Sequence, residues 1–319
     1  MTPEPEIDSA RFRASGHALI DLIADEWKQV APYISDISTE SLLASLLAST
    51  SVTTLDSGKL SSQDFERQML DEVLTLCGLP DRFRSTGPGG SVAFGTPAMS
   101  TIVAVLSARE RVAGQWRMGE LVAYVAQHEQ AAALRALRVA GLFEEQLQVL
   151  PVLDESSLRD AMIADLVADK RPFYVHTPVG NPLADGRGSV PELASVCKDF
   201  GAWLHVDGGR QGAAAFAPEL RGVNKGLTRV DSYQLDPSGL LGAGDGCSLF
   251  YIADEGPMIS ALSSQSGDVR LATNGADDGV HQLSPPSLIA GLTLWFLIRT
   301  KGADGLADAV RSLLPLRGF

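Results

Sequence analysis

The chain has 319 residues, of which 45% are hydrophobic and 20% charged, and its formal net charge is −13 at pH 7. This length can bury the core of one large domain or two ordinary ones, and the acidity argues against a nucleic acid or an anionic membrane surface as partner. We predict a cytoplasmic protein, because the start lacks a signal-peptide pattern, residues 292–298 are too short an apolar run to span a bilayer, and three widely spaced cysteines suit a reducing compartment.

Two amphipathic helices are predicted in the first quarter of the chain. Apolar residues at helical spacing predict one helix over 9–30 and a second over 62–77, which ends at Gly78 and Pro80. The polar stretch between them is typical of a loop. We therefore predict that residues 1–84 form a helical arm that does not fold by itself.

From about residue 85 the sequence pattern changes to short apolar runs that alternate with predicted helices. Val92–Phe94 is a short apolar run, after which Thr96 is a good N-cap and Pro97 a good first residue for a helix. The clearest unit covers 172–209, where an apolar run, a helix opened by the Ser189 capping box and a second apolar run predict a strand–helix–strand crossover.

The pattern as a whole predicts an α/β domain over residues 85–319 with a mostly parallel sheet. Ligands of such sheets bind at the carboxyl ends of the strands. Three segments should meet there: the helix start at Gly95–Thr96, His205–Asp207, and the loop 231–246. The apolar runs that support this are 92–94, 121–125, 173–175, 202–206 and 248–252.

Residues 203–254 carry a family likeness. WLHVDGG, PELRG, DSYQLDPSGL and GDGCS resemble the core of the pyridoxal-phosphate-dependent group II amino-acid decarboxylases, the aromatic-amino-acid and glutamate decarboxylase relatives. Those read roughly WLHVDAAYGG, NFNPHKW and DCS in the equivalent stretch. Residues 8–30, 92–111 and 292–306 resemble the family's N-terminal helix, phosphate-binding turn and LWF helix. The resemblance implies a fold type I, PLP-transferase-like large domain and pyridoxal phosphate as the family cofactor.

The resemblance also implies that this sequence is a shortened member. A segment that supplies substrate-pocket residues in the family is largely absent around 55–70, and the C-terminal small domain is missing after the LWF helix, so 85–319 is a truncated large domain. Family subunits form intertwined dimers through their N-terminal helices. We therefore expect a homodimer, or a heterodimer with a homologue.

The family's Schiff-base lysine has no counterpart in the matching motif. Asp236-Pro237-Ser238-Gly239 stands where the family has Asn-Pro-His-Lys, so Gly239 replaces the lysine and covalent cofactor binding is predicted to be absent. Asp236 would place a carboxylate beside the phosphate, a repulsion of several kcal/mol at about 4 Å that only protonation or Arg210 could relieve.

Other cofactor-binding positions are retained or altered. Asp207 matches the residue that pairs with the pyridine nitrogen, although local amides or Arg210 could satisfy it instead. Thr96 could be a plain N-cap with no ligand. The expected cofactor-binding residues are Gly95, Thr96, Gln130 at the ring-stacking position (with His128 nearby), Asn181, Asp207 and Ser238.

Other sites are less favoured. His205 and Asp207 could form a metal pair with Asp236 or Asp245, but a strand histidine beside an acid is more often a packed core residue, and no metal is predicted. Lys225 is a poor candidate for a displaced Schiff-base lysine.

Three functional hypotheses follow. The chain is a pseudoenzyme or partner subunit without lysine-dependent decarboxylation, a repurposed biosynthetic enzyme, or a non-covalent binder of pyridoxal or pyridoxamine phosphate. Each leaves room for a small-molecule ligand in the crevice. The candidate catalytic residues for the second hypothesis are His128, His205, Asp207, Arg210 and Asp236.

Overall fold

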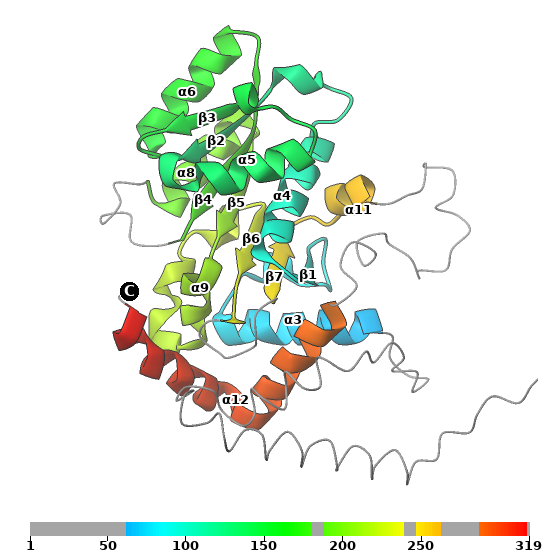
Figure 1. The fold of residues 1–319 in the computed structure, drawn as a ribbon, viewed down its shortest axis with the longest axis vertical. Coiled ribbons are helices and arrows are strands. Elements are labelled where there is room, and N and C mark those ends of the chain that lie inside the picture. Colours follow the sequence, from blue (N-terminus) through cyan, green and yellow to red (C-terminus); the bar gives the residue numbers. More distant parts are fainter. Residues whose placement is uncertain (1–61, 180–187, 239–246, 263–286, 318–319) are drawn as a thin grey trace, which may run out of the picture.

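The computed structural model describes residues 62–179, 188–238, 247–262 and 287–317, and these form an α/β domain around one seven-stranded sheet (Figure 1). The strand order is β1-β7-β6-β5-β4-β2-β3, and only β7 runs against its neighbours, so the predicted fold class is confirmed. The strands are β1 Gly90–Phe94, β2 Leu121–Ala126, β3 Leu147–Leu150, β4 Arg171–Pro178, β5 Trp203–Asp207, β6 Ser232–Leu235 and β7 Ser248–Ile252.

Helices cover both faces of the sheet. One apolar cluster joins α4, α5 and α11 to one face, and a second joins α3, α6, α8 and α12 to the other. The helices are α3 Ser62–Cys77, α4 Pro97–Arg111, α5 Gln130–Val139, α6 Glu155–Val167, α8 Val190–Phe200, α9 Gly209–Gly212, α11 Gly256–Leu262 and α12 Ser287–Arg317. Because both faces are covered, the strands are apolar along nearly their whole length.

Local signals set the ends of the predicted helices. The Thr96 hydroxyl accepts the Met99 N–H at 3.3 Å, and the Glu192 carboxylate accepts the Ser189 N–H at 2.8 Å. Gly201 ends α8 in the left-handed conformation, with φ of 65°, which costs a glycine little. The predicted caps at Thr96 and Ser189 and the crossover over 172–209 are confirmed.

Helix α3 shares its core with the sheet. Its apolar side, including Met69, Val73 and Leu74, is buried in the same cluster as the sheet, and the Glu66 carboxylate accepts the Ala93 N–H of β1 at 2.7 Å. Figure 1 shows α3 and α12 crossing at one end of the domain. The predicted helix over 9–30 lies outside the described residues, so the arm over 1–84 and the dimer stay predictions.

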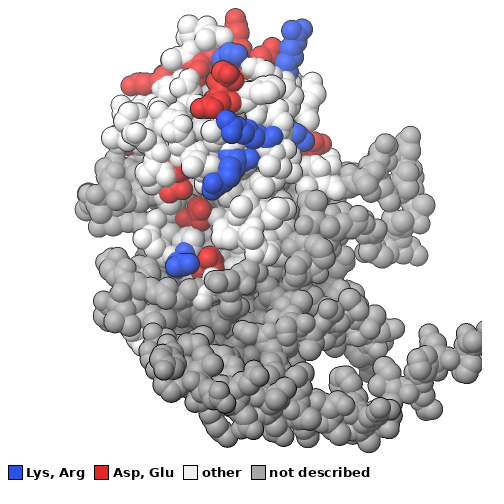
Figure 2. Space-filling model, in the orientation of Figure 1, with Lys and Arg blue, Asp and Glu red and all other residues white. Residues whose placement is uncertain are grey.

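The surface shows no extended region of one charge on the face that carries α5. Figure 2 shows acidic and basic side chains interspersed there. Among the described helices, none combines the length and the apolar character needed to cross a bilayer.

The bond from Glu66 to β1 leads to a stability prediction. Glu66→Ala leaves the buried Ala93 N–H without this acceptor and should lower the free energy of unfolding by about 1.5–3 kcal/mol. Glu66→Gln keeps an oxygen acceptor in place and should cost clearly less. Urea unfolding of both variants measures the difference, and equal losses would show that the bond does not hold α3 on the sheet.

Candidate functional site

An open pocket of about 680 Å³ lies at the carboxyl ends of the central strands. It is formed where the 3₁₀ turn η4 (Gln127–Glu129), which follows β2, meets the ends of β4 and β5 and the start of α9. This is the edge at which ligands of parallel sheets bind. Its lining residues are His128, Glu129, Pro178, Val179, Asp207, Gly208, Gly209, Arg210 and Gln211.

A row of polar and aromatic side chains leads up to this pocket on the α4 face of the sheet. Strands β4, β5 and β6 pair in parallel, so alternate residues of the three strands share one face. We call these residues the polar row, and they are Tyr174, His176, Trp203, His205, Asp207, Ser232 and Gln234.

Asp207 ends the polar row at the floor of the pocket. One of its carboxylate oxygens accepts the Gly209 N–H at 2.8 Å. Arg210 lines the same pocket but makes no ion pair with Asp207 in the described part of the chain. Of the two partners considered from the sequence, the local amide is therefore the one that the structure provides.

Two histidines of the polar row are buried beneath Asp207. The Nδ1 atom of His205 forms a hydrogen bond of 2.9 Å with the Ser232 hydroxyl. The Nε2 atom of the same ring has no hydrogen-bond partner. Burial, and secondarily the neighbouring His176, lowers the pKa of His205 well below the usual value for histidine. Burial also lowers the pKa of His176, against the opposing effect of Asp207. Both rings are therefore neutral at neutral pH.

Asp236 is held by its own turn. Its carboxylate accepts the Ser238 N–H at 2.9 Å and also the Ser238 hydroxyl. These two donors hold the carboxylate within its own turn, and its predicted repulsion of a phosphate stays a prediction.

The start of α4 is open. Thr96 is exposed, and a side-chain carbon at Gly95 would meet no atom within 4 Å. The second turn of α4 contacts the polar row, since the Thr101 hydroxyl donates to the Gln234 side-chain oxygen at 3.4 Å. An anion at this helix start would face only the backbone N–H groups that remain, since Pro97 has none and Thr96 already binds the N–H of Met99.

The structure brings together three of the predicted site residues, His128, Asp207 and Arg210, in the pocket lining. Gln130 begins α5 and does not line the pocket, and His205 is buried below it. Asn181 and Gly239 lie outside the described residues.

Sequence reasoning missed Glu129, His176 and Gln234. His176 is fully buried, with Nε2 3.8 Å from a Glu129 carboxylate oxygen, and Gln234 is buried with an unpartnered amide nitrogen. The signal was available in the alternation Tyr174, His176, which matches Trp203, His205 on the next strand. Only the register of the sheet shows that the two alternations are adjacent.

The family model for the pyridoxal-dependent decarboxylase conserved domain matches residues 20–317. That range includes the pocket and both faces of the sheet. The chain belongs to the pyridoxal-dependent decarboxylase family. That Asp207 of this pocket stands at the family's ring-nitrogen position stays a prediction from the sequence likeness described above.

Named relatives agree with the decarboxylase family. Tyrosine decarboxylase 2 of Arabidopsis thaliana is 28% identical over 338 residues, which cover 97% of this chain and 62% of the relative. The aromatic-L-amino-acid decarboxylase of Manduca sexta is 29% identical over 265 residues, covering 78% of this chain and 52% of the relative. The chain thus spans between half and two thirds of the length of these relatives.

Solved decarboxylase structures share the fold. The Oryza sativa TDC with PLP and tryptamine superimposes with a TM-score of 0.78 and 24% identity, over 99% of this chain and 79% of that one. The Catharanthus roseus tryptophan decarboxylase with L-tryptophan gives 0.77 and 21%, over 98% and 79%. At this identity the likeness establishes the fold type I architecture.

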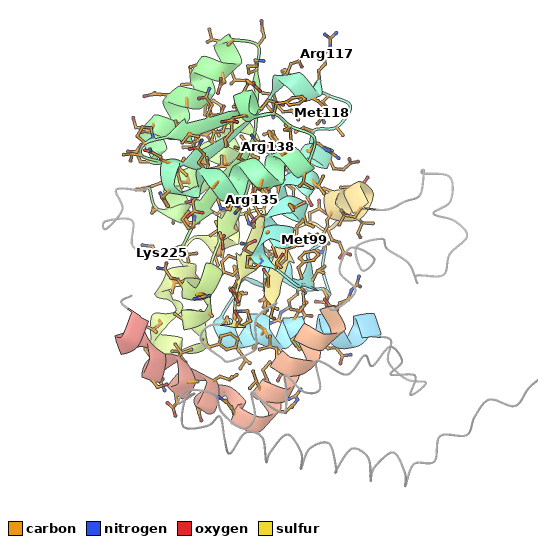
Figure 3. All side chains as sticks on the ribbon, in the orientation of Figure 1. Met99, Arg117, Met118, Arg135, Arg138 and Lys225 are labelled. Carbon is orange, nitrogen blue, oxygen red and sulfur yellow. The ribbon has the colours of Figure 1, made fainter. Side chains whose placement is uncertain are left out.

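The residues of the pocket fit the family cofactor in part. Asp207 suits a protonated ring nitrogen. The open helix start at Gly95–Thr96 suits a phosphate, although these two residues do not line the pocket. His128 adds an imidazole to the pocket wall. Among the described residues, the pocket lining offers no lysine for covalent attachment. Lys225 is close to Glu192 at the start of α8, away from the pocket lining, and Figure 3 shows it at the outer edge of the molecule.

Within the described ranges, no three His, Cys, Asp or Glu side chains are grouped as metal ligands. His205 and Asp207 lie on one strand face as expected, but the His205 ring is used within the sheet by its contact with Ser232.

The buried histidines predict acid sensitivity. Below about pH 6.5 the unfolded chain binds a proton on His205 that the folded chain does not bind. The free energy of unfolding should therefore decrease as the pH is lowered, by roughly 1.4 kcal/mol per pH unit for each such histidine. His205→Gln should remove one such contribution between about pH 5.5 and 6.5. Urea unfolding across this range measures the slope. His128→Gln, at an exposed histidine, is the control, and an unchanged slope in His205→Gln would contradict the prediction.

A close contact beneath the pocket gives a second prediction. A methyl group at Gly212 would overlap the Tyr233 hydroxyl, which is buried and has no hydrogen-bond partner. Gly212→Ala should therefore cost about 1–3 kcal/mol, whereas Tyr233→Phe alone should cost little. The double variant should recover most of the loss, as a double-mutant cycle of unfolding free energies would show. Additive effects would contradict the contact.

Proposed function

We propose that this chain is a decarboxylase-family protein that does not carry out lysine-dependent decarboxylation and that its crevice binds a pyridoxal-type ring without a covalent bond. The observation that carries the proposal is that Asp207 lines an open pocket whose described lining residues include no lysine.

The distribution of lysines supports the absence of covalent attachment. The sequence has six lysines, and none lies between Lys225 and Lys301. That interval contains the whole loop after β6, so a small shift in alignment around Gly239 does not supply an amine. Lys170 donates to the Gly119 carbonyl oxygen at 3.0 Å, and Lys198 lines a cleft at the opposite edge of the sheet.

Asp207 supports the non-covalent site. A carboxylate beside the ring nitrogen favours its protonated form, which lets the bound cofactor act as an electron sink. In this chain Asp207 would hold and orient that nitrogen, and the N–H groups at the start of α4 would hold the phosphate. The neutral His176 and His205 beneath add no competing positive charge to Asp207.

The partner-subunit role is part of the proposal. The relatives include decarboxylases of tyrosine and tryptophan, and this chain spans only part of their length. A homologue in a heterodimer could supply an amine and the remaining pocket residues, with this chain as a non-catalytic subunit.

Arg210 favours a second candidate function. It lines the pocket and makes no ion pair in the described part of the chain. A guanidinium in this position suits a carboxylate or phosphate ligand. Together with His128 and Asp207 it would let the crevice serve as the active site of a repurposed enzyme.

The test is a titration with pyridoxal phosphate, read by absorbance and equilibrium dialysis, followed by borohydride reduction and intact-mass measurement. We expect saturable binding without a reduced adduct, and no release of CO₂ from L-tyrosine or L-tryptophan. Asp207→Asn should weaken binding by about tenfold or more, since a charge-assisted bond is lost.

Asp304→Asn is the matched control, because it makes the same substitution at an exposed aspartate of α12. It should leave the affinity unchanged. An adduct on one lysine would overturn the non-covalent site, and absence of binding would overturn retention of the cofactor and favour the Arg210 alternative.

A further inference from the structure

A second cleft lies at the opposite edge of the sheet. Its volume is about 760 Å³, and it opens where β4, β5 and β6 begin, with Ala202 and Asp231 in its lining. The strands separate it from the pocket at Asp207 by their full length. Its basic side chains come from five separate places in the chain: Arg82, Arg111, Arg171, Lys198 and Arg229.

The two acidic residues of this cleft are already engaged. Asp231 accepts hydrogen bonds from the Arg111 guanidinium at 2.6 Å and from the Leu204 N–H at 2.8 Å. Asp199 accepts a hydrogen bond of 2.9 Å from Arg159, a residue that does not line the cleft. Five basic against two acidic side chains leaves a formal surplus of three positive charges. This surplus occurs in a chain whose net charge is −13.

Four of the basic side chains have no acidic partner in the described part of the chain. These are Arg82, which donates to the Thr228 carbonyl at 2.7 Å, Arg171, Lys198 and Arg229. The Arg171 Nε is buried without any hydrogen-bond partner, and its guanidinium packs where a side chain at Gly201 would otherwise lie. A buried guanidinium nitrogen without an acceptor is costly and marks a place where an acceptor is missing.

Two helix ends oppose this positive charge but do not cancel it. Helices α4 and α8 end at Arg111 and Phe200, so their negative ends face the cleft. Each contributes roughly half a negative charge, or about one charge together. The surplus of three is therefore reduced to about two. Capping of the helix ends alone does not account for the number of cations.

We propose that this cleft binds a small, multiply charged oxyanion, either a phosphorylated or a polycarboxylate metabolite. A volume in this range suits a small molecule. Guanidinium groups bind phosphate and carboxylate oxygens through paired hydrogen bonds. The proposal does not depend on whether the crevice at Asp207 binds a pyridoxal-type ring.

Isothermal titration calorimetry of the full chain with pyrophosphate and, separately, with citrate tests the proposal. We expect saturable binding of at least one of them. Arg229→Gln and Lys198→Gln, both at exposed positions, should each weaken it by about tenfold. The anion that binds more tightly identifies phosphate or carboxylate as the preferred chemistry.

Arg135→Gln is the control, because it removes the same charge from the exposed side of α5, outside the cleft (Figure 3). It should leave the affinity within about twofold, the size of a long-range effect that salt screens. If all three variants weakened anion binding equally, the effect would come from the net charge of the protein and not from the cleft, and the proposal would be overturned. Absence of binding of both anions at millimolar concentration would also overturn it.

Discussion

The in-register parallel pairing of β4, β5 and β6 is the constraint on which both candidate sites depend. It places Pro178, Asp207 and the side chains after them at one edge, and it places the beginnings of the same strands at the other. Since side chains alternate between faces, a shift of one residue would move His205 and Asp207 to the opposite face and remove the polar row. Asp231 strengthens this register, because its carboxylate accepts the N–H of Leu204, the second residue of β5.

The polar row is a costly feature inside an otherwise apolar sheet. Nitrogen atoms of His176, His205 and Gln234 are buried without hydrogen-bond partners, and each such group costs about 1–3 kcal/mol. Two apolar clusters, one on each face, offset this cost. A row of unsatisfied polar atoms that ends at a carboxylate in an open pocket is typical of a binding edge, where recognition competes with stability.

The chain retains the family's architecture while the chemistry of its crevice differs from the family motif. Asp207 lines the pocket at the end of β5, and Thr96 at the helix start is exposed. Asp236, which is predicted to stand where the family has an amide, accepts the Ser238 N–H in a local turn. These observations are consistent with a crevice that has kept recognition and changed its reactive groups.

The sequence by itself determined the fold class, the helix caps and the family. Thr96, Ser189 and Gly201 act through contacts within a few residues, so their roles can be predicted from local chemistry. The position of Asp207 at a strand end followed in the same way. That Gly239 stands at the lysine position stays a prediction from the sequence, because the residue lies outside the described part of the chain.

Only the tertiary structure decided which distant side chains meet. Glu66 binds β1 from α3, His176 lies beneath Asp207, and basic residues from Arg82 to Arg229 converge at the other edge. These contacts join residues separated by up to about 150 positions, and strand register sets them. The sequence pattern within one strand does not show how that strand aligns with its neighbours. This alignment is set by how the side chains on both faces of the whole sheet pack.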